Sequence, residues 1–106
     1  MIKRIWHGWT TPENAPRYEN LLKTEIFPAI AARSIPGYRA IELLRREHDG
    51  EIEFITIMTF DSVEAVRKFA GEDYTVSYVP PKARELLARR DLHSQHYDVV
   101  ESRTCD

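Results

Sequence analysis

The stretch that decides the fold is YRAIELLRREHDGEIEFITIMTF, residues 38–60. Two runs rich in aliphatic and aromatic residues, 38–47 and 51–60, are separated by a short polar segment that contains Asp49-Gly50. An Asp-Gly pair favours a two-residue type I′ turn, because both of its residues tolerate positive φ. The stretch therefore predicts an antiparallel β-hairpin.

The two-residue loop also predicts the register of this hairpin. Counting back from the turn gives four opposing pairs: His48 and Glu51, Arg46 and Glu53, Leu44 and Ile55, and Glu42 and Ile57. Arg46 and Glu53 then form a cross-strand pair of opposite charge, which supports the register.

The register divides the side chains of the hairpin between two faces of the sheet. One face carries Ile41, Leu43, Phe54, Thr56, Met58 and Phe60. The other face carries Ala40, Glu42, Leu44, Ile55, Ile57 and Thr59. Both faces have large aliphatic groups at their centres, whereas an antiparallel sheet with one solvated face alternates more cleanly. We therefore expect both faces to be covered.

The segments around the hairpin complete a βαββαβ order. They are a strand over 2–10, a helix from about 18 to 30, a helix over 62–70, a short helix opened by Pro80-Pro81, and a strand over 93–100. Pro28 lies within the first helix and lacks a backbone donor, so we expect a kink or a break there. This order predicts an α+β, ferredoxin-like fold, in which both main helices lie on one face of an antiparallel sheet.

That topology leaves one apolar sheet face without helices. Soluble monomers rarely expose contiguous apolar patches of more than several hundred Å². A second copy of the chain, related by a two-fold axis, would hide the patch in both subunits. We therefore predict a homodimer with the sheets facing each other. The alternative is that the short third helix folds back over this face.

Composition excludes several classes of partner. The 106 residues suit one domain, 1–106, with a polar tail at about 102–106. A net charge of −2 lacks the basic footprint of a nucleic-acid binder, and no apolar run is long enough to span a membrane. The charged N-terminus does not resemble a signal peptide, and the lone Cys105 forms neither an internal disulfide nor a zinc motif. We therefore expect a cytoplasmic protein with no metal and no cofactor. The last helix carries a group of basic residues, which we place on a solvated face: Lys82, Arg84, Arg89 and Arg90.

Two histidines are the candidate catalytic residues. His7 lies in the first predicted strand and His96 in the last, and these strands are neighbours in the expected topology. Because imidazole titrates near neutral pH, a histidine pair could deprotonate an acidic organic ligand. The alternative for each residue is an ordinary hydrogen-bonded histidine at a strand end.

Four further residues are candidates for binding such a ligand. Trp6 and Trp9 could stack on a planar molecule, although strand aromatics are more often part of the core. Glu42 lies on an otherwise apolar face, where burial would raise its pKa and make it a candidate base; at the rim of the sheet it would instead pair with an arginine. Tyr74 lies in a loop over 72–79 that could act as a lid or be an ordinary surface loop.

Four short motifs resemble the antibiotic biosynthesis monooxygenase (ABM) family: RIWHG at 4–8, IPGY at 35–38, FAGED at 69–73 and HY at 96–97. The resemblance extends over nearly the whole chain. It implies a dimeric α/β barrel built from facing sheets, with a ligand pocket between each sheet and its own helices. It also implies the chemistry of relatives that oxidise phenolic compounds with dioxygen and no cofactor. In that chemistry the substrate is deprotonated and its anion gives an electron to oxygen.

Other relatives in this family bind and degrade heme. The resemblance assigns that activity to an Asn on strand one, a Trp at the end of strand three and a His on helix two. This chain has no Asn in strand one, Phe60 at the Trp position, and no His in 62–70. The heme-degrading residue set is therefore not present in the sequence.

Two hypotheses of different class follow. The first is a small homodimeric enzyme, such as a cofactor-independent monooxygenase, acting on a planar or enolisable organic compound. The second is a non-catalytic ligand-binding or stress-related dimer of the same fold, and an isomerase or lyase on this scaffold is a further alternative. An enzyme should have a pocket into which at least one histidine reaches, whereas a binding protein should have both histidines outside the pocket.

Overall fold

The computed structural model describes residues 1–105 of the chain. Its elements are, in order, β1 (Ile2–Thr10), α1 (Ala15–Leu21), the π-helical segment η1 (Leu22–Ile26), α2 (Phe27–Ala32), β2 (Tyr38–His48), β3 (Glu51–Phe60), α3 (Val63–Ala70), α4 (Pro81–Leu86), β4 (Arg89–Arg90) and β5 (Gln95–Asp98). The strands form one antiparallel sheet in the order β2-β3-β1-β4, and β5 also pairs with β1. The predicted α+β, ferredoxin-like fold is confirmed.

The predicted hairpin and its register are confirmed. Asp49 and Gly50 both have positive φ, 51° and 78°, as a type I′ turn requires. All four predicted pairs, from His48 opposite Glu51 to Glu42 opposite Ile57, are present in the ladder. The predicted cross-strand ion pair is present too, with Arg46 Nε 2.6 Å from Glu53 Oε1.

The expected irregularity at Pro28 takes the form of a wider helical turn. The π-helical segment η1 stands directly before Phe27, whose backbone N–H donates to the carbonyl of Leu22 five residues back. Because proline has no N–H to donate, the wider turn lets the helix continue into α2. The helix therefore bulges rather than breaks.

The C-terminal part differs from the sequence-based expectation. Arg89 and Arg90 form strand β4 beside β1 instead of continuing the last helix. The backbone N–H of Asp91 donates to the carbonyl of His7, so this segment is hydrogen-bonded to the edge of β1. The last strand covers only 95–98 because His93 and Ser94 pair instead with the loop near Val76.

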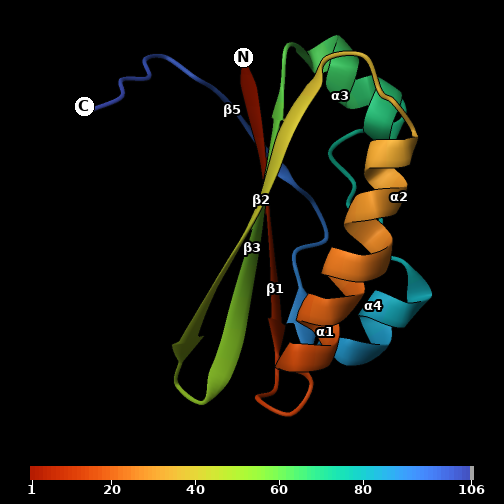
Figure 1. The fold of residues 1–106 in the computed structure, drawn as a ribbon, viewed down its shortest axis with the longest axis vertical. Helices are drawn as coiled ribbons and strands as arrows, with labels where there is room; N and C mark the ends of the chain where they lie inside the picture. Colours follow the sequence, from red (N-terminus) through yellow and green to blue (C-terminus); the bar gives the residue numbers. More distant parts are fainter. Residues whose placement is uncertain (106) are drawn as a thin grey trace.

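All helices lie on one face of the sheet (Figure 1). The buried core lies between them and the sheet, with Tyr18, Phe54, Phe60 and Val66 almost fully buried. Helix α4 packs against α1 on the same side, so it does not cover the other face as the alternative required. On that open face Leu44 and Tyr97 are 42% and 55% exposed.

No helix within residues 1–105 is both long enough and apolar enough to cross a membrane.

Candidate functional site

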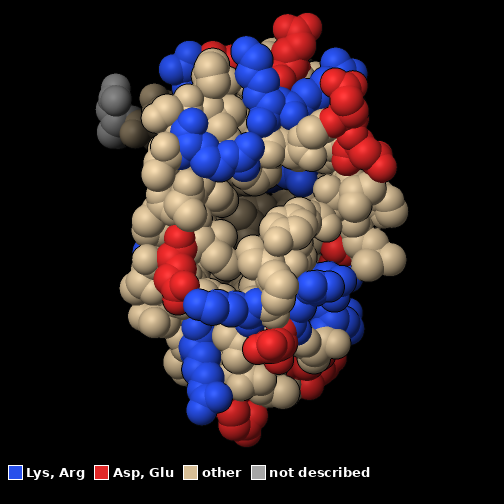
Figure 2. Space-filling view, turned by 90° about the vertical axis from the view of Figure 1, so that its right-hand side faces the viewer, with Lys and Arg blue, Asp and Glu red and all other residues tan. Residues whose placement is uncertain are grey.

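A cavity lies between the sheet and the helices. Its inner part has a volume of about 110 Å³, and the residues on the sheet that line it are Arg4, Trp6, Ile41, Thr56 and Met58. It shares residues with a wider groove of about 1000 Å³ that runs between η1 and α2, the end of α3 and the segment 76–82. Figure 2 shows this hollow on the helical side of the molecule, with residues other than Lys, Arg, Asp and Glu over most of its centre and both basic and acidic side chains around it.

Arg4 is the charged group of the inner cavity. Side chains alternate along β1, so Arg4 lies with Ile2 and Trp6 on the face that the helices cover. The residue is only 6% exposed, and burial lowers the pKa of its guanidinium to about 10. Nη1 donates to the carbonyl of Tyr74 at 2.5 Å, and no carboxylate within residues 1–105 forms an ion pair with Arg4. A buried charge without a counterion is costly, which points to a site for an anion.

His96 contacts Arg4 but does not line the cavity. The two residues are paired across β1 and β5, and Arg4 Nη1 is 2.9 Å from His96 Nε2. Because a guanidinium can only donate, Nε2 must accept, which leaves the imidazole neutral with its proton on Nδ1. Burial, and then the charge of Arg4, lower the pKa of His96. His96 therefore holds Arg4 in place without lining the cavity itself.

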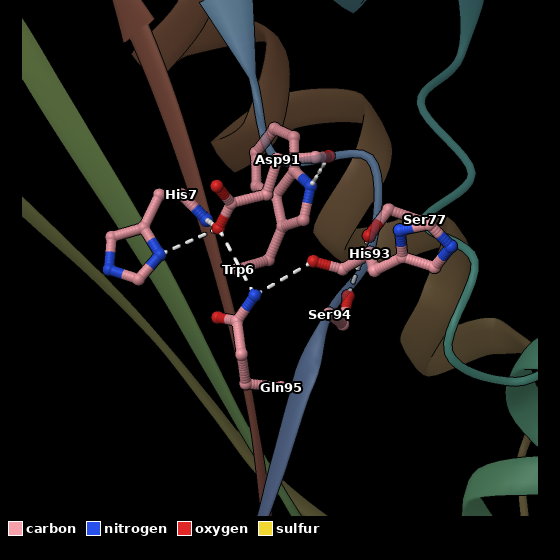
Figure 3. A network of polar contacts seen from close by, with 7 residues as sticks. All are labelled: Trp6, His7, Ser77, Asp91, His93, Ser94 and Gln95. Carbon is pink, nitrogen blue, oxygen red and sulfur yellow. Dashed lines mark hydrogen bonds and ion pairs between the residues drawn. The ribbon is translucent and has the colours of Figure 1, made fainter.

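His7 lies on the opposite face of the sheet. The register sets Arg4 opposite His96, and His7 is three residues further along β1, so its side chain points away from the cavity. His7 Nδ1 is 2.8 Å from Asp91 Oδ2, and the backbone N–H of His7 donates to the same oxygen at 3.1 Å (Figure 3). The structure does not bring the two histidines together.

The two tryptophans are also separated by the sheet. Trp6 lines the inner cavity, and its Nε1 donates to the backbone carbonyl of Asp91 at 2.8 Å (Figure 3). Trp9 lies on the open face, where it stacks beside His7 and beneath the guanidinium of Arg89, 4.1 Å from the ring centroid. Only Trp6 can contact a ligand in the cavity.

Glu42 and Tyr74 do not line the cavity either. Glu42 is exposed on the open face of the single chain, so it lacks the burial that its predicted role as a base requires. Tyr74 is half-buried, with its ring edge-on to His96 at 5.1 Å and beneath the guanidinium of Arg67 at 5.4 Å. These contacts, and the bond from Arg4 to its carbonyl, attach this part of the loop to the sheet and to α3.

Sequence reasoning missed three polar residues of the cavity. The sequence prediction includes Arg4 only within the RIWHG motif, although its position between Ile2 and Trp6 on an alternating strand is a signal of burial. Ser77 and Ser94 line the inner cavity and share a hydrogen bond of 2.7 Å (Figure 3). No local pattern marks this pair, because the two segments meet only through the bridge between Val76 and His93.

The site does not fit a heme whose iron is held by imidazole. None of the residues that line the cavity or the groove, all within the described chain, is a histidine. Helix α3 also has none, in agreement with the sequence. Among residues 1–105 no group of three or more His, Cys, Asp or Glu side chains is placed to hold a metal ion.

Comparison with known proteins shows the fold. No family model matches the sequence, and no curated protein matches it either. Three solved structures of similar fold are Rv0793 from Mycobacterium tuberculosis, a Bacillus cereus protein provisionally named an antibiotic biosynthesis monooxygenase, and the heme degrader MhuD from M. tuberculosis, which has two hemes bound in its active site.

The similarity spans whole chains at low identity. Rv0793 aligns with a TM-score of 0.64 at 19% identity, over 97% of this chain and 98% of its own. The B. cereus protein aligns with a TM-score of 0.62 at 14% identity, over 99% and 95%. MhuD aligns with a TM-score of 0.63 at 19% identity, over 98% and 100%. The resemblance to ABM-like proteins is therefore confirmed at the level of the fold.

Proposed function

We propose that the protein is a homodimer that binds a planar, weakly acidic organic compound as its anion in the cavity beneath η1 and α2. The observation that carries the proposal is Arg4, a buried cation in the cavity wall without a carboxylate partner in residues 1–105. An anion would supply the missing counterion in a site where water screens the charges poorly.

The walls around Arg4 suit a flat apolar body. Trp6 and Phe69 line the inner cavity together with aliphatic side chains from η1, α2 and the sheet. Aromatic rings stack favourably on planar ligands, and a largely apolar pocket with a few polar groups is typical of small-molecule sites. The hydroxyl groups of Ser77 and Ser94 add hydrogen-bonding capacity in the same cavity.

The open face of the sheet supports the homodimer. Helix α4 lies on the helical side, so the aliphatic residues of the open face, including Leu44, remain uncovered in the single chain. A second copy packed by two-fold symmetry would remove this surface from water on both subunits. Glu42 and His7 lie on this face, so their surroundings would change on dimerisation.

The position of the histidines favours binding over catalysis. An enzyme was expected to place a histidine in its pocket, and neither His7 nor His96 lines the cavity of this chain. His96 acts instead on Arg4, which it contacts through Nε2. The remaining polar groups of the cavity are suited to holding an anion rather than to removing a proton.

Cofactor-independent oxygenation is the second candidate. The B. cereus neighbour carries a monooxygenase name, and an anion stabilised by Arg4 is the species that would give an electron to dioxygen. In the balanced reaction an activated CH₂ group and one O₂ become a carbonyl and one water. Oxygen uptake with a panel of hydroquinones and enolisable ketones tests this candidate. The variants His7→Ala and His96→Ala test whether the uptake depends on either histidine.

Calorimetric titration with 2-naphthoate and with its neutral counterpart 2-naphthamide tests the binding proposal. The two probes have the same ring system and differ chiefly in charge. Charge-assisted hydrogen bonds contribute about 1.5–3 kcal/mol, so the acid should bind at least about 10-fold more tightly than the amide. Equal affinities for the two, or no binding of the acid, would refute the proposed anion site.

A further inference from the structure

Two arginines share one aromatic ring in the wider groove. The guanidinium carbon of Arg4 lies 5.5 Å from the ring centroid of Phe69, and that of Arg33 lies 5.3 Å from the same centroid. The two charges are therefore at most about 11 Å apart. Both arginines and the Phe69 ring line the groove.

Arg33 also has a charge that the described chain does not balance. Its Nη2 donates to the carbonyls of Phe69 at 3.1 Å and Lys68 at 3.3 Å, which are neutral acceptors at the end of α3. A guanidinium has five N–H donors, so these bonds leave donors free. The acidic residue that lines the groove, Glu25, forms an ion pair with Lys82 at 3.2 Å instead.

We infer that the preferred ligand is a dianion: a rigid, flat, apolar compound with two acidic groups, one bound by Arg4 in the inner cavity and the other by Arg33 at the groove. This inference rests on the proposed anion site at Arg4 and adds the class of compound that the site takes. Ile26, Ile30 and Phe69 line both the cavity and the groove, so the wall shared by the two spaces is apolar and suits an apolar body.

The two arginines should contribute unequally. Arg4 is buried and Arg33 is exposed, and solvent-exposed ion pairs contribute much less than buried charge-assisted bonds. The pair with Arg33 should therefore increase affinity by about fivefold at most. Arg4 accounts for binding of the acid, and Arg33 for the preference for a second acidic group.

The experiment compares 2-naphthoate with 2,6-naphthalenedicarboxylate by calorimetric titration at low salt. The symmetric diacid can enter in two equivalent orientations, which by itself doubles its affinity. With the contribution of Arg33, we expect the diacid to bind the unmodified protein more than twofold and up to about tenfold more tightly than the monoacid. Arg33→Gln should reduce this ratio to the statistical factor of about two without weakening the monoacid.

Arg67→Gln is the matched control. Arg67 is also an exposed arginine stacked on an aromatic ring, that of Tyr74, but it does not line the groove. This variant should keep the full preference for the diacid.

The possible outcomes separate the two proposals. If the monoacid binds but the diacid gains no more than twofold, or if Arg33→Gln keeps the larger gain, the dianion inference is wrong and the anion site stands. If neither acid binds, both proposals are wrong.

Discussion

The Arg4→Met substitution tests whether Arg4 binds a ligand or only stabilises the fold. Methionine retains much of the length and apolar character of the side chain but removes the charge and the donors. Arg4 donates to the carbonyl of Tyr74 and to His96 Nε2, so the variant leaves both acceptors without this partner.

The opposing effects on folding stability can be estimated. Burial lowers the pKa of Arg4 from 12.5 to about 10, which corresponds to a cost of about 3 kcal/mol for keeping the charge in the folded state. The folded and unfolded states both hold the proton at pH 7, so the cost is present there and disappears only as the pH rises from about 10 to 12.5. Losing the two charge-assisted bonds costs about 3–6 kcal/mol. The free energy of unfolding should therefore fall by no more than about 3 kcal/mol.

Ligand affinity should respond far more strongly. Removing the counterion of a bound carboxylate costs about 1.5–3 kcal/mol, so 2-naphthoate should bind Arg4→Met about 10- to 150-fold more weakly. Urea unfolding at a fixed protein concentration measures stability, since the midpoint for a dimer depends on concentration. Calorimetric titration measures affinity, and Arg17→Met, at an exposed position on α1, is the control for loss of one positive charge.

The opposite pattern would refute the assignment. If Arg4→Met unfolds with a loss of 4 kcal/mol or more while the affinity for 2-naphthoate stays the same, Arg4 is a structural residue. A loss of affinity in Arg17→Met equal to that in Arg4→Met would show that binding depends only on net charge.

Three other predictions follow from the same geometry. Burial and the Arg4 charge lower the pKa of His96, so its imidazole should titrate below 6.5 by NMR and move upward, without reaching 6.5, in the methionine variant described above. Because the folded pKa is the lower one, the contribution of His96 to stability is complete above pH 6.5 and is lost as the pH falls through the folded pKa; a pKa above 6.5 would contradict this. Leu44→Lys on the open face should halve the mass measured by light scattering at micromolar concentration, whereas Val76→Lys, with a similar exposure on the helical side, should not; a monomeric unmodified protein would refute the dimer. Gly37→Ala should destabilise the protein by roughly 2–4 kcal/mol in urea unfolding, because its φ is +85° and the new Cβ would lie 2.7 Å from a side chain of α3. Gly50→Ala has a similar φ and open space, so it should cost only about 1–2 kcal/mol, and equal losses would contradict the packing argument.

Local chemistry made the hairpin predictable. The Asp49-Gly50 turn allows one short loop, and that loop leaves one register in which Arg46 meets Glu53. The position of Pro28 likewise indicated where the first helix would be irregular. Each of these predictions depends on residues close together in the chain, so no distant contact was needed to make it.

The C-terminal third was harder to predict for the opposite reason. Residues 89–90 and 93–94 have no strong preference of their own, and their structure is set by bonds to the edge of β1 and to the loop near Val76. These partners are far away in sequence. The basic character of Arg89 and Arg90 suggested a solvated helix, whereas pairing with Gly8 and Trp9 made them a strand.

The amino-acid sequence by itself determined the order of the elements as far as α4, the hairpin register and which residues of each strand share a face, because turn chemistry and the two-residue period of a strand are local properties. Only the tertiary structure decided which candidate residues form a site. The pairing of Arg4 with His96 put His96 beside the cavity and left His7 on the opposite face of the sheet. It also left Arg4 buried beside Phe69 without a carboxylate partner in residues 1–105, a consequence of packing between segments that are distant in the chain.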